Sequence, residues 1–163
     1  MKTLLIIYYS KTGGSEAMAA AAAQAARGEK NVRTVLRCAG EAGPEDMLAA
    51  DGYLFVCPEN LAAIAGGMKL FLDECFYPLS GRIEGRPYAA MICAGSDGES
   101  AKNQLERIAT GWRLKKVADT LIVCTHAQSP EQILAPKRIN AADREKCAET
   151  GATLAAGLAM GVF

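Results

Sequence analysis

The chain has 163 residues, half of them hydrophobic, and its 18 lysines and arginines balance its 18 aspartates and glutamates. This composition supports one well-buried core over residues 1–163, is too short for two ordinary domains, and excludes intrinsic disorder, which combines low hydrophobicity with high net charge. The zero net charge also argues against nucleic acid as a partner, because no excess of basic residues is present to neutralise phosphates.

The six cysteines are widely spaced, and none forms the C-x-x-C pair that is typical of metal or redox centres. Most lie in apolar segments such as 54–57 and 121–124, which favours buried reduced thiols over a disulfide framework. The N-terminal apolar segment is too short for a signal peptide, and no apolar run approaches the ~20 residues of a membrane span. We therefore expect a cytoplasmic protein without a metal site or a membrane partner.

Short apolar segments alternate with helical patterns along the whole chain. The strands are expected at residues 4–9, 32–38, 53–57, 88–93 and 120–124. The helices are expected at residues 15–27, 43–46, 67–76 and 100–113, and from Asn140 onwards. Pro58 is expected to end the third strand. This alternation predicts a three-layer, doubly wound α/β fold with a five-stranded parallel sheet.

In an open α/β sheet, ligands bind beyond the carboxyl ends of the strands, so the loops at these ends are the candidate site. The first such loop reads Ser10-Lys11-Thr12-Gly13-Gly14-Ser15. Its glycines permit positive φ angles and close approach, its hydroxyls can donate hydrogen bonds, and the following helix N-terminus favours an anion. The spacing matches neither the Walker nor the dinucleotide motif, and a simple helix cap remains an alternative to phosphate binding.

Two further loops complete the candidate site. Residues 58–67 form a long apolar stretch that is expected to be a loop and to provide a wall for a planar apolar ligand. The alternative is an extra turn of the following helix, over residues 61–64. The third loop, around Gly95-Ser96-Asp97-Gly98, combines flexible glycines with exposed backbone amides, although it could equally be a helix entry.

Two stretches of the sequence also resemble known motifs. Residues 8–15 read Tyr-Tyr-Ser-Lys-Thr-Gly-Gly-Ser, which resembles the FMN phosphate signature of the flavodoxin-like superfamily. Asp51-Gly52, an apolar strand, Pro58, and then Gly-Gly-Met-Lys-Leu-Phe-Leu-Asp at residues 66–73 resemble the second signature of the NAD(P)H:quinone and FMN-dependent reductases in that superfamily. The order and length of the elements agree with this resemblance over the whole chain.

The resemblance implies a flavodoxin-like strand order of 2-1-3-4-5, with FMN lying across the ends of strands one, three and four. The FMN phosphate would be held by Ser10, Lys11, Thr12, Gly13, Gly14 and Ser15. The flavin ring would be flanked by Pro58, Glu59, Asn60 and Leu61, mainly through backbone groups, and bordered on its other side by Gly95, Ser96, Asp97 and Gly98. Many relatives have Asn where Gly14 stands, and Thr, Arg or Phe-type residues where Glu59, Asn60 and Leu61 stand.

The resemblance further implies an oxidoreductase that takes hydride from NAD(P)H through FMN and passes electrons to a quinone or a similar small-molecule acceptor. Flavodoxin carriers usually have an acidic face and loop aromatics that sandwich the flavin, whereas this chain is neutral and has no aromatic residue in residues 58–67 or 94–100. An electron carrier and a non-catalytic flavin-binding protein remain the alternatives. Because relatives are often dimers or tetramers, the resemblance also admits a homo-oligomer.

Three other features have ordinary structural interpretations. His126, the only histidine, follows the fifth strand and is a candidate proton donor at the flavin edge, but lone histidines in such loops are more often structural. Trp112 shares a helical face with Leu105 and Ile108 and is expected in the core. The thiols of Cys57 and Cys93 have no flanking base and are expected to be inert.

Overall fold

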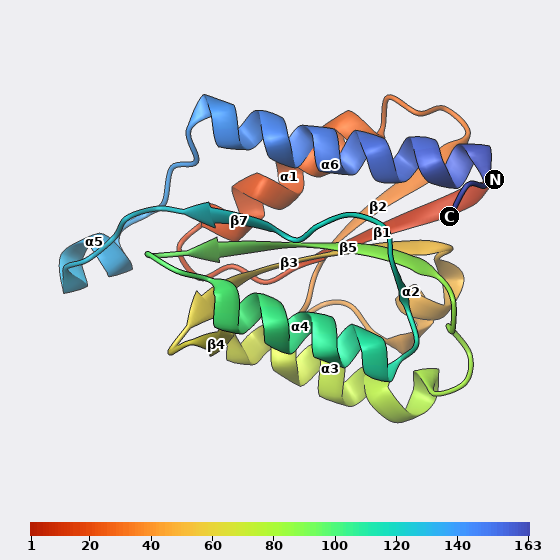
Figure 1. The fold of residues 1–163 in the computed structure, drawn as a ribbon, viewed down its shortest axis with the longest axis horizontal. Coiled ribbons are helices and arrows are strands. Elements are labelled where there is room, and N and C mark those ends of the chain that lie inside the picture. The colour runs from red at the N-terminus through yellow and green to blue at the C-terminus, as the bar shows by residue number, and fades with distance from the viewer.

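The computed structural model describes residues 1–163 and places a parallel β-sheet between two layers of helices (Figure 1). The five main strands lie in the order β2-β1-β3-β5-β7, which confirms the predicted 2-1-3-4-5 topology. They are β1 (Lys2–Tyr8), β2 (Val32–Cys38), β3 (Gly52–Asn60), β5 (Pro87–Ala94) and β7 (Leu121–Cys124). Two short strands, β4 (Ala63–Ile64) and β6 (Lys115–Lys116), extend this sheet.

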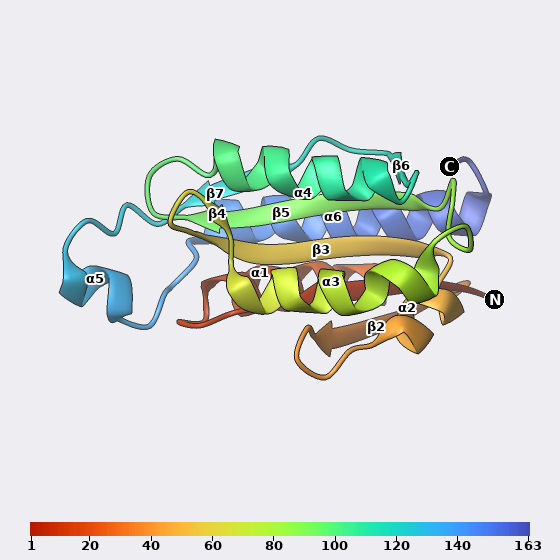
Figure 2. The same ribbon diagram turned by 90° about the horizontal axis from the view of Figure 1, so that it is seen from below.

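The helices divide between the two faces of the sheet (Figures 1 and 2). They are α1 (Gly14–Ala26), α2 (Pro44–Ala49), α3 (Gly66–Leu79), α4 (Glu99–Gly111), α5 (Pro130–Leu134) and α6 (Ala141–Met160). α1 and α6 cover one face, α2, α3 and α4 cover the other, and α5 projects beyond the end of the sheet. None of these helices is both long enough and apolar enough to cross a membrane.

Each central strand is buried on both faces, as the continuous apolar runs predict. In β1, Leu4 and Ile6 pack against the layer of α1 and α6, while Leu5 and Ile7 pack against the layer of α3 and α4. The alanine-rich sequence of α1 lets α6 approach closely: a Cβ on Gly151 would lie 2.1 Å from the carbonyl oxygen of Ala22. Small side chains at this crossing therefore fix the distance between the two helices.

Two predicted features of the third strand are wrong. Pro58 does not end β3, which continues to Asn60 while Pro58 pairs with Cys93 of β5. Residues 58–67 are not a loop, and residues 61–64 are not a helical turn: the chain reverses at residues 61–62 and returns as β4, antiparallel to β3. The short elements β6 and α5 were not predicted either.

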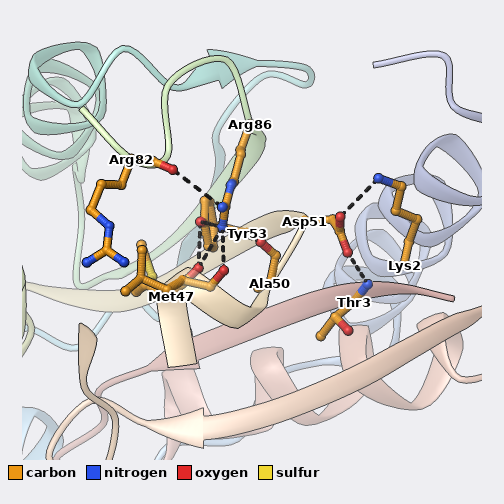
Figure 3. A network of polar contacts seen from close by, with 9 residues as sticks. Lys2, Thr3, Met47, Ala50, Asp51, Tyr53, Arg82 and Arg86 are labelled. Carbon is orange, nitrogen blue, oxygen red and sulfur yellow. Dashed lines mark hydrogen bonds and ion pairs between the residues drawn. The ribbon is translucent and has the colours of Figure 1, made fainter. Parts of the chain in front are cut away.

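At the amino end of the sheet, Arg86 and Asp51 fix the entry into β3 (Figure 3). The Arg86 guanidinium donates hydrogen bonds to the carbonyls of Met47, Leu48 and Ala50, and so satisfies the C-terminal end of α2. The Asp51 carboxylate accepts from the Thr3 N–H at 2.8 Å and from Lys2 Nζ at 3.0 Å. Burial alone would raise the pKa of Asp51, but these bonds and the Arg86 charge lower it. The Asp51-Gly52 part of the second signature is therefore a structural anchor, at the opposite end of the sheet from the loops considered below.

Candidate mononucleotide site

Three chain segments meet beyond the carboxyl ends of β1, β3 and β5. The strand register pairs Tyr8 with Val56 and Pro58 with Cys93, so the segments that follow these strands emerge side by side. This is the end of the sheet from which α5 projects, at the left of Figure 1. The predicted candidate residues are thus brought to one edge of the sheet, as the doubly wound topology requires.

The first segment leads into α1 and leaves the amides of the helix N-terminus open. Gly13 is the N-cap residue with φ +92° and offers no side chain to cap the helix. The Ser10 hydroxyl instead accepts a hydrogen bond from the Gly13 N–H at 3.0 Å, which holds the turn. No acceptor in the protein reaches the N–H groups of Gly14, Ser15 and Glu16. Such a row of free amides at the positive end of a helix dipole is an anion-binding site.

We call residues 10–16 the cradle. On the side that faces Cys93 and Lys137, this segment is tightly packed. A Cβ on Gly14 would lie 2.7 Å from the Cys93 sulfur and 3.3 Å from Cβ of Lys137, so only glycine fits without displacing them. The Lys137 N–H donates to the Thr12 carbonyl at 2.7 Å, which ties the segment after α5 to the loop. The Ser15 hydroxyl is buried beside Cys93 without a hydrogen-bond partner.

The second segment is the hairpin formed by the end of β3 and by β4. Its two turn residues, Leu61 and Ala62, have φ angles of +50° and +58°, a left-handed conformation that costs non-glycine residues roughly 1–2 kcal/mol each. The side chain of Leu61 is fully exposed at the tip. The hairpin is held by hydrogen bonds from the Ala65 N–H to the Pro58 carbonyl and from the Ile64 N–H to Gln104 of α4, at 3.1 and 2.8 Å.

The third segment leads from β5 into α4 through Gly95, Ser96, Asp97 and Gly98. It is held from the β7 side, where the N–H of His126 donates to the Gly95 carbonyl at 2.8 Å. The N–H groups of Ser96 and Asp97 have no acceptor in the protein. The Gly98 and Ala101 N–H groups donate instead to the carboxylate of Glu59, at 3.0 and 3.4 Å. Glu59, predicted as a neighbour of the flavin ring, caps the N-terminus of α4 in this structure.

The glycine-rich start of α3 makes room for an aromatic ring. A Cβ on Gly67 would lie 2.1 Å from the ring of Tyr9, the residue that follows β1. Further along the helix, Met68, Phe71 and Leu72 are buried in the core. Lys69 and Asp73 form an exposed ion pair at 2.6 Å. The second signature therefore serves the packing of α3 and the position of Tyr9.

The cysteines near the site are free thiols. Burial raises the pKa of Cys57 to about 12 and that of Cys93 to about 11, so both stay protonated at neutral pH, as an inert thiol requires. No group of three or more His, Cys, Asp and Glu side chains is arranged to hold a metal ion.

The remaining predicted residues lie at the margins. Trp112 is 4% exposed and belongs to the core, as predicted. The side chain of His126 is exposed and makes no hydrogen bond, and its backbone has φ +58°. Two contributors were missed, Gln104 and Lys137. The helix that precedes Lys137 was signalled by Ser129-Pro130-Glu131-Gln132, a capping box with proline at the first helical position.

Fold and site together define a flavodoxin-like α/β protein with an open helix N-terminus at α1 and two facing segments, the β3–β4 hairpin and the third loop. The family model of NADPH-dependent FMN reductases matches residues 41–128, which is more than half of the chain. The protein therefore belongs to this family.

Individual similar proteins have the same type of fold. The chain is 34% identical over 98 residues to a protein named flavodoxin from Aquifex aeolicus, a match that spans 60% of this chain and about half (53%) of that relative. An archaeal flavodoxin structure covers 94% of this chain, with 96% of its own length matched, a TM-score of 0.75 and 17% identity. A WrbA-like protein from Agrobacterium tumefaciens matches over 99% of both chains, with a TM-score of 0.72 and 19% identity. These structures show the fold.

Proposed function

We propose that this protein binds FMN, with the phosphate on the open N-terminus of α1 and the ring between the β3–β4 hairpin and the third loop. The observation that carries the proposal is the row of unpaired N–H groups at Gly14, Ser15 and Glu16, behind an N-cap glycine that cannot fill the site itself. Lys11 adds an exposed positive charge at the loop. The family assignment supports the same placement.

FMN, when bound, supplies the chemistry of one- and two-electron transfer. The protein then has three tasks: to hold the phosphate with the α1 amides, to orient the ring, and to leave one ring face accessible. The free N–H groups of Ser96 and Asp97 are positioned to donate to polar atoms at the ring edge. The Asp97 side chain is exposed.

We further propose that NAD(P)H is the electron donor and that a quinone or a similar small molecule is the acceptor. Hydride transfer requires a nicotinamide to stack within about 3–3.5 Å of the reactive atom, and therefore an uncovered ring face. Neither the hairpin nor the third loop contains an aromatic residue that could cover the ring. The family name, which specifies NADPH, supports this donor, and the six free cysteines support a reducing compartment such as the cytoplasm.

The test begins with the apoprotein, titrated with FMN and with riboflavin while the visible absorbance and the thermal stability are followed. We expect FMN to bind and stabilise the protein, and riboflavin, which lacks the phosphate, to bind more weakly. Failure of FMN to bind would end the proposal. NADH and NADPH oxidation is then measured with FMN and benzoquinone, and sustained turnover supports the reductase.

A one-electron carrier is the second candidate, because the curated relative with 34% identity is named a flavodoxin. The same assay separates the two functions. A carrier would bind FMN with comparable affinity but would oxidise neither nicotinamide nucleotide at a useful rate, and would exchange electrons with a redox protein instead.

A further inference from the structure

Glu59 occupies the N-terminus of α4 with a carboxylate that belongs to the protein itself. Oε1 accepts from the Gly98 N–H at 3.0 Å and Oε2 from the Ala101 N–H at 3.4 Å, so both oxygens face the helix. Glu59 forms no ion pair with a basic side chain. Its partners are thus the amides and the dipole of α4, which are the groups that a bound anion would use.

The continuation of β3 explains how Glu59 reaches the helix. Alternate residues of a strand share one face, and Tyr53, Phe55 and Cys57 pack against the α3 and α4 layer. Glu59 lies on the same face of the strand, because β3 continues beyond Pro58 to Asn60. The carboxylate therefore projects from the end of a paired strand.

A second bond fastens the hairpin to the same helix. Gln104, on α4, accepts from the Ile64 N–H at 2.8 Å, so β3 and β4 are each linked to α4 by one side chain. These two links hold a turn whose residues, Leu61 and Ala62, are both left-handed. A conformation of this kind persists when surrounding contacts over-determine it, and such strain gathers at binding sites.

We propose that Glu59 is a specificity-determining, positioning residue whose negative charge disfavours anionic groups of the ligand at the α4 N-terminus, where the N–H groups of Glu99 and Ser100 have no acceptor in the protein. The site would then have one anion position, at α1, and would accept a ligand with a single phosphate and an uncharged ring at its far end. The same carboxylate would oppose the accumulation of negative charge on that ring during reduction. The inference rests on the proposed function, since it assigns the ring end of the FMN ligand to the α4 side.

The first experiment uses the apoprotein, so that it does not depend on flavin binding. Inorganic phosphate is titrated into isotope-labelled wild-type protein and into Glu59→Ala, and the backbone amide resonances are followed. In the wild type, we expect shifts at residues 14–16 and none at Gly98 or Ala101. In Glu59→Ala, Gly98 and Ala101 should shift as well, because their N–H groups are free. Absence of a second responsive region in the variant, or a response of Gly98 in the wild type, overturns the inference.

The second experiment measures FMN affinity and midpoint potential in Glu59→Gln, which keeps the size of the side chain and removes its charge. The control is Glu99→Gln, because Glu99 is exposed in the first turn of α4 and pairs with Lys102 at 3.1 Å. We expect a higher potential in Glu59→Gln, because the negative charge that opposes reduction of the ring is removed. Glu99→Gln should match the wild type, and thermal melting verifies folding.

The two proposals fail in different ways. If wild-type protein does not bind FMN but Glu59→Ala gains the phosphate response at Gly98, the proposed function falls and the anion-excluding role of Glu59 stands. If wild-type protein binds FMN, and the Glu59 variants leave the phosphate response and the potential unchanged, the role of Glu59 falls and the proposed function stands.

Discussion

The N-termini of α1 and α4 have almost the same backbone, but a carboxylate of the protein lies only at the start of α4. Each begins at a glycine, Gly13 with φ +92° and ψ −10° and Gly98 with φ +89° and ψ −13°, and neither glycine can cap its helix with a side chain. Each also has an acidic residue in its first turn, Glu16 or Glu99. The Gly13 N–H is bound by Ser10 and the Gly98 N–H by Glu59, and the next two amides of each helix are open. The helices differ at the third position, where the Glu16 N–H is open and the Ala101 N–H is bound by Glu59.

This difference shows that the local sequence of a helix start does not decide which of its amides find a partner within the protein. The deciding residue for α4 lies 39 positions earlier in the chain, at the end of β3. An anion site is thus defined by what the rest of the fold leaves unpaired.

The largest expected effect is on the free energy of unfolding, and it differs between substitutions at the two cap glycines, Gly98 and Gly13. A Cβ on Gly98 would lie 2.7 Å from Cγ2 of Ile122, whereas a Cβ on Gly13 would meet nothing within 4 Å. Gly98→Ala should therefore cost about 3 kcal/mol, from left-handed strain and overpacking together, and Gly13→Ala about 1 kcal/mol from strain alone. Urea unfolding measures both values, and equal losses would contradict the packing difference.

A substitution at Gly14 tests how closely the start of α1 packs against Cys93. Gly14→Ala should destabilise the protein by about 1–2 kcal/mol and weaken FMN binding, because the new methyl group overlaps the Cys93 sulfur, 2.7 Å away. The double variant with Cys93→Ala removes that sulfur and should recover part of the loss. Thermal unfolding and FMN titration of the single and double variants check this, and a double variant no better than Gly14→Ala would refute it.

A smaller effect is expected at Ser10, which shapes the open site without filling it. Ser10→Ala removes the acceptor of the Gly13 N–H, at a cost of about 1 kcal/mol in the free energy of unfolding. FMN affinity should fall, because the turn that presents the α1 amides is loosened. Ser10→Thr keeps the hydroxyl and serves as the matched control in the same denaturation and binding measurements.

The smallest effect concerns Asp51, whose carboxylate also accepts from a backbone amide, but at the other end of the sheet. Its pKa is lowered in the folded protein, so its contribution to stability is present above the unfolded pKa and is lost as the pH falls through the folded pKa. Asp51→Asn should cost under about 1 kcal/mol at pH 7, since the pair with Lys2 is partly exposed to solvent. Denaturation at several pH values should show wild type and variant converging in acid.

The strands, the sheet ends and the position of the three segments were predictable from the residues, because continuous apolar runs and helix-start signals are local, whereas the strand order was predicted from the resemblance to the flavodoxin-like superfamily. Ser10 and Gly13 could be assigned to the cradle for the same reason. The β3–β4 hairpin could not be predicted. Its left-handed turn residues are Leu61 and Ala62, and neither is the Asn or Gly that usually marks such a turn. Pro58 also suggested a strand end, although its ring is tolerated in β3.

The polar links across the site were beyond local sequence reasoning. Glu59 meets Gly98, and Gln104 meets Ile64, over separations of about 40 residues, and no periodicity encodes such pairs. One signal was available for Glu59: it continues the alternation of Tyr53, Phe55 and Cys57, provided that the strand is extended beyond Pro58.

The bond from the Lys137 N–H to the Thr12 carbonyl sets an order of events during synthesis. Residues 10–15 are translated well before Lys137, the residue that braces them. Domains fold as units once their distant contacts are available, so we expect cofactor capture only after Lys137 has been translated. Chains that stop before residue 137 should emerge colourless, however complete their first strands.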